Sequence, residues 1–260
     1  MRIDIRHISK SFALEDGAVR TIFPDFSFTL DAPEFITIIG PNGCGKSTLL
    51  NLIAGFIQPD KGVIELSGNG SATKIGYVFQ DYRASLLPWL NVYRNIEFPL
   101  TLEHLDKSAR HRIVDELLAE FNLPFSSKQR VYKLSGGQQQ LVCLLRSLVA
   151  KPSILLCDEP FSALDQSTRW TMAFYLEEFW LKMQIPVFFV SHDIDESILL
   201  SDRILLLNKS GTIERILENR LERPRNIGML NSLEHISLRK QVIEFMKDNG
   251  AIQDRTGRHS

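Results

Sequence analysis

Phe35–Ile39 reads FITII, and the nine residues that follow, 40–48, read GPNGCGKST. The continuous apolar run predicts a buried strand. From Lys46 onward, the leucines and the isoleucine at positions 49–53 recur with helical spacing, and Gly55 predicts where this helix ends. A glycine-rich loop between a strand and a helix is the context in which such loops bind phosphate. The stretch therefore predicts an α/β core that binds a nucleotide.

The residues of this loop suit a phosphate group. Glycines let the backbone pass close to a ligand, so that consecutive N–H groups and the positive start of the following helix face the same anion. Lys46 adds a full charge at the β- and γ-phosphates, and the Ser47 hydroxyl can ligate Mg²⁺. A plain glycine-rich turn is the alternative, which the flanking strand and helix disfavour. The candidate nucleotide-binding residues are Gly40, Pro41, Asn42, Gly43, Cys44, Gly45, Lys46, Ser47 and Thr48.

A second apolar run, 154–157, ends in Asp158 and Glu159. Asp158 is placed to hold the Mg²⁺ shell, and Glu159 can accept a proton from an attacking water. Acids at a strand end are often a solvated edge or a helix cap. Their position downstream of a phosphate loop favours the catalytic interpretation.

Residues 134–138 read LSGGQ and open a predicted helix. Ser135 is a natural N-cap, and the glycines allow close backbone approach. A capped helix start is a sufficient structural explanation. Like the helix start after the phosphate loop, this one carries a partial positive charge, so it could also bind a γ-phosphate that another copy of the chain presents. The candidate residues of this segment are Ser135, Gly136, Gly137 and Gln138.

The apolar patterning predicts an α/β fold. Alternating apolar positions near the N-terminus indicate antiparallel strands, and helical patterns separate short apolar strands in the second half. Three helical stretches without an intervening strand, 90–100, 107–121 and 136–150, indicate an inserted helical subdomain. The predicted architecture is a P-loop NTPase core, mainly a parallel sheet with helices, plus an antiparallel β subdomain. The predicted domains are a discontinuous core (1–82 and 152–217), a helical subdomain carrying LSGGQ (83–151) and a C-terminal extension (218–260). In this extension the pattern over 233–246 predicts an amphipathic helix, which suits packing against the core or a dimer contact, and packing is favoured.

Composition narrows the function classes. Thirty Lys and Arg against 31 Asp and Glu give a net charge of -1, without the basic excess of a general nucleic-acid binder. No apolar run approaches the roughly 18 residues of a membrane span, and the first residues lack a signal peptide's apolar core. We expect a soluble, cytosolic chain. The three cysteines lack metal-ligand spacing; Cys143 and Cys157 suit a core, whereas Cys44 lies near a helix start that can lower a thiol pKa.

Six motifs stand in a fixed order, and together they resemble the ATP-binding subunit of an ABC transporter over nearly the whole chain. They are GPNGCGKST (40–48), Gln80, LSGGQ (134–138), LLCDEP (155–160), SALD (162–165) and His192. The resemblance implies a head-to-tail dimer that closes around two ATP molecules, with Mg²⁺, and that hydrolyses them. The partner would be a second copy or a related chain.

The resemblance also assigns roles. The phosphate loop and acidic pair of one chain face Ser135 and Gly137 of the other, and Asp165 bridges the two sites. Phe12 occupies the place of an aromatic residue that stacks on adenine. The implied catalytic residues are Lys46, Gln80, Glu159 and His192, and the implied metal ligands are Ser47, Gln80 and Asp158. The segment 139–142 departs from the family, where glutamine and arginine usually alternate.

The stretch 79–92, which contains FQD, LLPW and NV, resembles the importer branch that handles nitrate, sulfonate, taurine and bicarbonate-like solutes. The resemblance implies that a membrane permease docks near residues 80–92 and that an extracytoplasmic solute-binding protein belongs to the same system. The chain would then lie on the inner face of the membrane. The alternatives are an export ATPase, or a soluble ABC ATPase acting on DNA or ribosomes; a small-molecule kinase has no use for LSGGQ.

Overall fold

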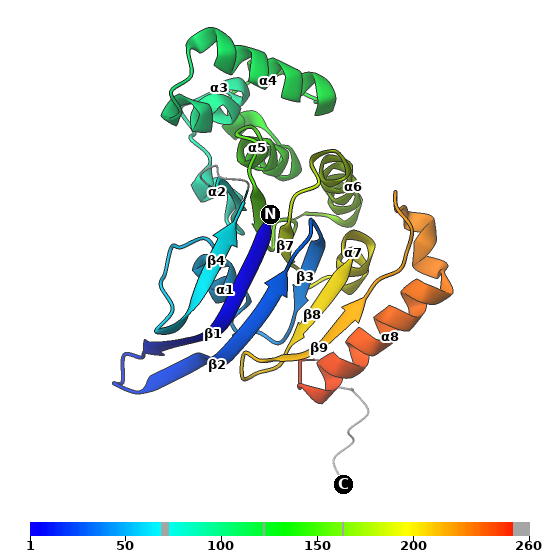
Figure 1. The fold of residues 1–260 in the computed structure, drawn as a ribbon. Helices are drawn as coiled ribbons and strands as arrows, with labels where there is room; N and C mark the ends of the chain where they lie inside the picture. Colours follow the sequence, from blue (N-terminus) through cyan, green and yellow to red (C-terminus); the bar gives the residue numbers. More distant parts are fainter. Residues whose placement is uncertain (69–72, 122, 163, 252–260) are drawn as a thin grey trace. The chain divides into compact units, whose positions relative to one another are not determined.

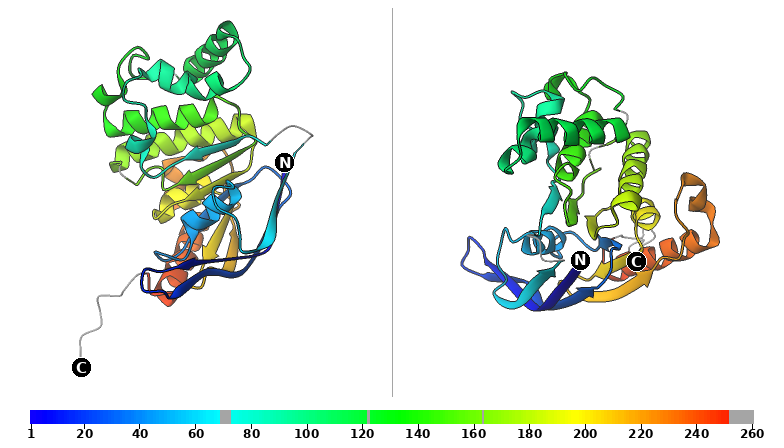
Figure 2. Two further views of the ribbon diagram at one scale, coloured as in Figure 1. Left: turned by 90° about the vertical axis from the view of Figure 1, so that its left-hand side faces the viewer. Right: turned by 45° about the horizontal axis from the view of Figure 1, so that its top comes forward.

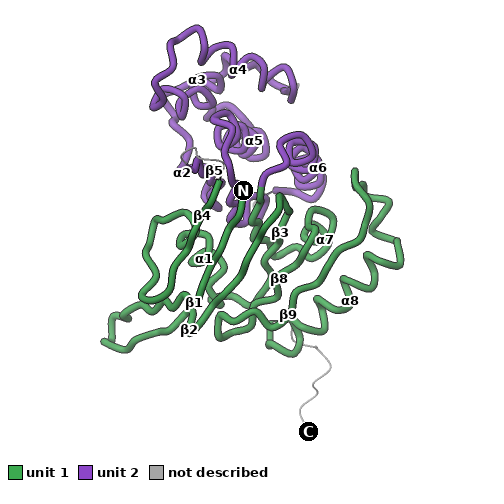
Figure 3. Tube along the Cα trace, viewed as in Figure 1, with its two compact units in different colours: residues 1–71, 186–260 green, residues 72–185 purple. Residues whose placement is uncertain are grey.

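The computed structural model describes residues 1–68, 73–121, 123–162 and 164–251 (Figure 1). Two compact units divide the chain, one formed by residues 1–71 and 186–260 and the other by residues 72–185 (Figure 3). The domain limits predicted from the sequence remain a prediction. Ala163 of the SALD motif and the last residues of the predicted extension lie outside the described residues.

The first unit holds two groups of strands. Its strands are β1 (Arg2–Ala13), β2 (Val19–Leu30), β3 (Phe35–Ile39), β4 (Lys61–Ser67), β7 (Val187–Val190), β8 (Arg203–Leu207) and β9 (Ile213–Glu218). Strands β1 and β2 form a long antiparallel hairpin, drawn in blue in both views of Figure 2, and β4 pairs with the other edge of β1. Its register places Ile3 opposite Leu30 and Ile5 opposite Phe28, all buried, as the alternation predicts.

Strands β7, β3, β8 and β9 lie side by side in that order. Strand β3 runs parallel to β7 and to β8, and all five of its residues are buried, as the FITII pattern predicts. Strand β9, which the sequence pattern did not reveal, pairs antiparallel with β8. Only a short turn separates them, in which Gly211 N donates to Asn208 O at 3.0 Å. A parallel crossover needs a dozen or more residues, so the antiparallel direction follows.

The helices of the first unit are α1 (Lys46–Ile53), α7 (Ile194–Leu200), the 3-10 turn η3 (Ile227–Asn231) and α8 (Leu233–Asp248). Helix α8 matches the helix predicted over 233–246. Its buried Leu238, Val242 and Phe245 pack in one cluster with Ile198 of α7 and Leu206 of β8. The C-terminal extension therefore covers the core of this unit, which is the simple packing that the sequence favours.

Helix α8 also meets the first turn of α7 through charged groups. Arg239 Nε lies 2.9 Å from Asp195 Oδ1, and His235 Nε2 lies 3.5 Å from the same oxygen. His235 is 1% exposed, and burial lowers its pKa; Asp195 raises it and Arg239 lowers it, both by less.

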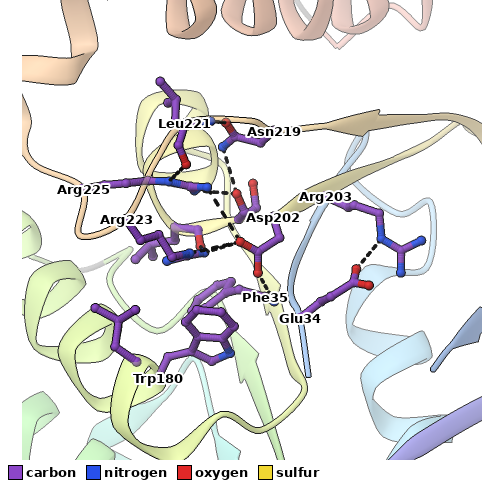
Figure 4. Close-up of polar contacts among 12 residues, drawn as sticks. Glu34, Phe35, Trp180, Asp202, Arg203, Asn219, Leu221, Arg223 and Arg225 are labelled. Atoms are coloured by element: carbon purple, nitrogen blue, oxygen red, sulfur yellow. Dashed lines mark hydrogen bonds and ion pairs between the residues drawn. The ribbon is translucent and has the colours of Figure 1, made fainter. Parts of the chain in front are cut away.

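A polar cluster ties the start of the extension to α7 and β3 (Figure 4). Arg225, 4% exposed, donates to the carbonyls of Ile198, Leu199 and Ser201 at the end of α7. Asp202 accepts from the backbone N–H of Phe35 at 2.8 Å and from Arg223 at 2.8 and 3.0 Å. Cationic side chains at a helix C-terminus satisfy carbonyls that have no partner within the helix. The cluster thus fixes α7 at the end opposite His192.

The second unit pairs β5 (Ile75–Val78) in parallel with β6 (Ile154–Asp158). Its helices are α2 (Tyr82–Ser85), α3 (Val92–Glu97), α4 (Lys107–Phe121), α5 (Gly136–Leu148) and α6 (Gln166–Met183), with 3-10 turns η1 (Phe98–Leu102) and η2 (Val131–Lys133). The helix predicted over 90–100 is in fact α3 followed by η1, because Pro99 has no N–H to continue an α-helix. Among the described residues, no helix is long and apolar enough to span a membrane.

Candidate functional site

The phosphate loop of the first unit joins β3 to α1, and Lys46 is folded into it. The Lys46 side chain is only 6% exposed, and its Nζ donates to Gly40 O at 2.9 Å and to Pro41 O at 3.2 Å. Gly45, immediately before α1, has no side chain to cap the helix. The first N–H groups of α1 therefore suit an anion, and a buried ammonium lies beside them.

Parallel pairing brings His192 to the same edge as this loop. Ile38 of β3 pairs with Val190 of β7, so the loop and His192 both follow the carboxyl ends of neighbouring strands. His192 is exposed there, just ahead of α7. Ligands of open α/β sheets bind at this kind of edge. Phe12, the predicted adenine platform, lies near the end of β1 and is 39% exposed.

The second unit brings Gln80, Asp158 and Glu159 together in the same way. Val78 of β5 pairs with Cys157 of β6, and Gln80 Nε2 donates to Glu159 Oε2 at 3.1 Å. Asp158 is 9% exposed. Glu159 has φ 48, in the left-handed region that costs a non-glycine residue about 1–3 kcal/mol. Such strain concentrates at functional sites, which agrees with the catalytic interpretation of this pair.

The LSGGQ segment starts α5 with a capping box. Ser135 Oγ accepts from Gln138 N at 3.4 Å, and Gln138 Oε1 accepts from Ser135 N at 3.0 Å. This confirms Ser135 as the N-cap. A Cβ on Gly137 would come within 2.3 Å of Thr168 Cγ2 on α6, so close packing inside the unit requires a glycine at this position.

Comparison with known proteins identifies the family. Residues 23–162 match the family described as ABC transporter. The chain belongs to the ABC transporter family. It is 38% identical over 257 residues to the aliphatic sulfonates import ATP-binding protein SsuB of Bacillus cereus, covering 97% of this chain and 99% of that protein. It is 42% identical over 205 residues to the taurine import ATP-binding protein TauB of Pseudomonas fluorescens, covering 77% of each chain.

A solved structure agrees with this assignment. The dimeric post-hydrolysis state of the ATP-binding cassette MJ0796, bound to ADP and Pi, matches with a TM-score of 0.72 and 28% identity, covering 85% of this chain and 100% of that chain. The resemblance drawn from the six motifs and the predicted fold class are thereby confirmed. The chain is an ABC-type ATPase.

Asp165, expected to bridge two sites in this ABC ATPase, caps α6 within its own chain. Its carboxylate accepts from Thr168 N at 3.0 Å and from Thr168 Oγ1 at 2.6 Å. These hydrogen bonds, led by the one from the hydroxyl, lower the pKa of Asp165. The ionised side chain is thus held at the start of α6.

The cysteines of the ABC ATPase are all buried. Cys143 and Cys157 lie in the core, as predicted. The expectation of a lowered pKa for Cys44 is wrong, because burial raises the pKa of this thiol by more than the nearby Lys46 lowers it.

The residues that the resemblance assigns to Mg²⁺ have suitable donor atoms. Ser47 of the first unit offers a hydroxyl oxygen, and Gln80 and Asp158 of the second unit offer an amide and a carboxylate oxygen, which are the hard donors that Mg²⁺ prefers. Among the described residues, His, Cys, Asp and Glu form no cluster of three or more that could hold a metal. Mg²⁺ usually binds through one or two carboxylates together with substrate phosphates, so a single buried carboxylate fits this ion.

The predicted docking stretch, residues 80–92, contains α2 and then a loop that exposes Trp89, which is 66% accessible. Asn95, fully buried, holds this loop: its Oδ1 accepts from Leu87 N at 2.9 Å, and its Nδ2 donates to Leu87 O and Asn91 O at 3.1 and 3.0 Å. Arg130 donates to Trp89 O. The sequence did not indicate this role of Asn95, because nothing in a helical pattern shows which backbone groups outside the helix an asparagine side chain will bind.

Proposed function

We propose that this ABC ATPase drives an importer. Two copies, or one copy and a related chain, close around two ATP molecules and power uptake through a permease. The solute is nitrate, a sulfonate, taurine, a bicarbonate-like ion or another small organic compound. The names of the relatives support the import direction and the class of solute. The observation that carries the catalytic part is the hydrogen bond between Gln80 and Glu159.

ATP binding is assigned to the first unit. The phosphate loop and the start of α1 bind the phosphates, Lys46 neutralises their charge, and Phe12 stacks on adenine. Mg²⁺, held by Ser47, Gln80 and Asp158, would supply positive charge that neutralises the phosphate oxygens. The partner chain completes each site with its LSGGQ residues Ser135, Gly136, Gly137 and Gln138, and Asp165 lies between the two sites.

Hydrolysis is assigned to Glu159 as the general base. The amide of Gln80 donates to its carboxylate and thereby orients it. His192 orients the γ-phosphate for attack. Loss of that phosphate removes the group that both chains hold, so the dimer opens. Gln80 lies next to the proposed docking loop in sequence, which supports a role in reporting nucleotide occupancy to the permease.

The partners follow from this proposal. The permease docks near residues 80–92, where Trp89 offers an exposed apolar contact. An extracytoplasmic binding protein delivers the solute, and the ATPase lies on the cytoplasmic face of the membrane through its permease. No nucleic acid is involved.

Glu159→Gln tests the proposal because it keeps the hydrogen-bonding shape and removes the base. Turnover should fall by about 10²–10⁴, ATP should still bind, and a closed dimer should accumulate. The trapped dimer, solubilised from native membranes, should carry a multi-span permease that mass spectrometry identifies. Near wild-type turnover would rule out Glu159 as the base, and recovery of ribosomes or DNA-maintenance proteins alone would overturn the import function.

A further inference from the structure

Arg20 of β2 lies against the phosphate loop. Its side chain is exposed, and its Nη2 donates to Gly43 O at 2.9 Å. Gly43 has φ 77, and a Cβ built on it would come within 2.7 Å of the same Nη2. The lack of a side chain at Gly43 therefore allows the positive φ of the loop and leaves room for the Arg20 guanidinium.

Within the part of the chain that the structure describes, no carboxylate neutralises the charge of Arg20. Among the described residues, no Asp or Glu oxygen lies within ion-pair distance of it, whereas Arg2 and Arg6 on the neighbouring strand pair with Asp31 at 3.1 Å and Glu65 at 2.5 Å. A guanidinium has five N–H donors, and the bond to Gly43 uses one. A full positive charge with further donors thus stands beside the phosphate loop.

The hairpin places Arg20 beside the proposed adenine platform as well. Phe12 and Arg20 are directly opposed in the β1–β2 register. Opposed residues project from the same face of a sheet, with Cβ atoms about 4.5–5.5 Å apart. The Arg20 side chain therefore projects from the same face of the hairpin as Phe12, and its guanidinium contacts the phosphate loop. A nucleotide whose base stacks on Phe12 must pass its phosphates across this position to reach residues 43–47.

We propose that Arg20 is a second cation of the nucleotide site, which binds the phosphate chain of ATP while it braces the loop at Gly43. This inference rests on the proposed nucleotide site. Lys46, the phosphate-binding cation proposed above, makes the same kind of contact as Arg20: its Nζ donates to the carbonyls of Gly40 and Pro41 in the loop. The planar fork of arginine suits bidentate binding of phosphate, which lysine cannot reproduce.

The test compares Arg20→Ala and Arg20→Lys with Arg6→Ala, an exposed arginine of the same sheet. Binding of ATP is measured by calorimetry, and binding of adenosine by chemical-shift titration at millimolar concentration. Loss of a charge-assisted hydrogen bond should weaken ATP binding by about tenfold to a hundredfold. Adenosine binding should stay unchanged, Arg20→Lys should recover part of the loss, and Arg6→Ala should match the wild type.

Three results would overturn the inference: unchanged ATP affinity in Arg20→Ala, an equal loss for ATP and adenosine, or an equal loss in Arg6→Ala. A wild-type chain that binds no ATP would instead refute the proposed nucleotide site. A wild type that binds ATP while Arg20→Ala binds it equally well refutes the role of Arg20 alone.

Discussion

One methyl group decides whether the second glycine of LSGGQ can be replaced. An alanine Cβ at Gly137 would lie 2.3 Å from Thr168 Cγ2, while the next nearest atoms, Leu164 Cδ2 and Thr168 Cβ, would lie at 3.6 Å. Overpacking costs about 1–3 kcal/mol, and alanine recovers up to about 1 kcal/mol of helix propensity. We therefore expect Gly137→Ala to destabilise the second unit by up to about 2 kcal/mol.

Thr168→Ser is the matched partner for this change. It removes Cγ2 and keeps Oγ1, which donates to Asp165 at 2.6 Å. The double variant Gly137→Ala/Thr168→Ser leaves ordinary contacts around the new methyl group, so its stability should return to that of the wild type or exceed it. This is a double-mutant cycle between two touching residues, where strong coupling is expected.

Intrinsic fluorescence is the right assay, because Trp89, Trp170 and Trp180 all lie in the same unit as Gly137. Urea midpoints of the two single variants and the double variant give the coupling energy. If the double variant unfolds at the same urea concentration as Gly137→Ala, the clash with Cγ2 is not the cause. ATPase activity of the stable double variant then separates two roles: continued loss supports contact of Gly137 with the other chain's nucleotide, and recovery assigns the glycine to packing.

Lys46→Ala should weaken ATP binding by at least about tenfold, because a charge-assisted contact to phosphate is lost; unchanged affinity in calorimetry would refute this role. Trp89→Ala should reduce co-purification with the permease and leave ATP affinity intact, whereas Leu102→Ala, which truncates another exposed apolar residue, at 76%, should change neither co-purification nor ATP affinity. His235 binds a proton more readily in the unfolded chain than in the folded one, because burial lowers the pKa of its imidazole in the folded chain. Stability should therefore fall as pH drops below about 6.5, the ordinary pKa of histidine, and His235→Gln should flatten this part of the urea-midpoint profile.

The sequence predicted the strands and helices that have a clear apolar pattern or carry a phosphate-site motif. FITII became a buried strand, and the acidic pair Asp158 and Glu159 came to lie beside Gln80, because neighbouring parallel strands end at one edge. Those motifs are visible because phosphate chemistry restricts which residues can stand at each position. The fold followed from the same restriction, since a phosphate loop needs a strand before it and a helix after it.

The sequence did not predict the residues that support the site from a distance along the chain. Strand β4 is exposed or half-exposed along its whole length, so it has no buried alternation to read. Arg20, Asn95 and Arg225 act through backbone carbonyls or N–H groups of other segments. A carbonyl has no sequence signature, because every residue carries one. Such partners become visible only when the fold has brought the segments together.

The two interpretations that the sequence left open at LSGGQ are compatible. Ser135 Oγ accepts from Gln138 N as a helix cap, yet a hydroxyl that accepts in this way still has its own proton to donate. Capping therefore fixes the rotamer of Ser135 without using up its capacity to bind a phosphate oxygen. Asp165 differs, because Thr168 already donates twice to its carboxylate, and an acid cannot donate in return once its pKa is lowered. A hydrogen bond between Asp165 and a second chain therefore needs a donor on that chain. Backbone N–H groups and cationic side chains are such donors.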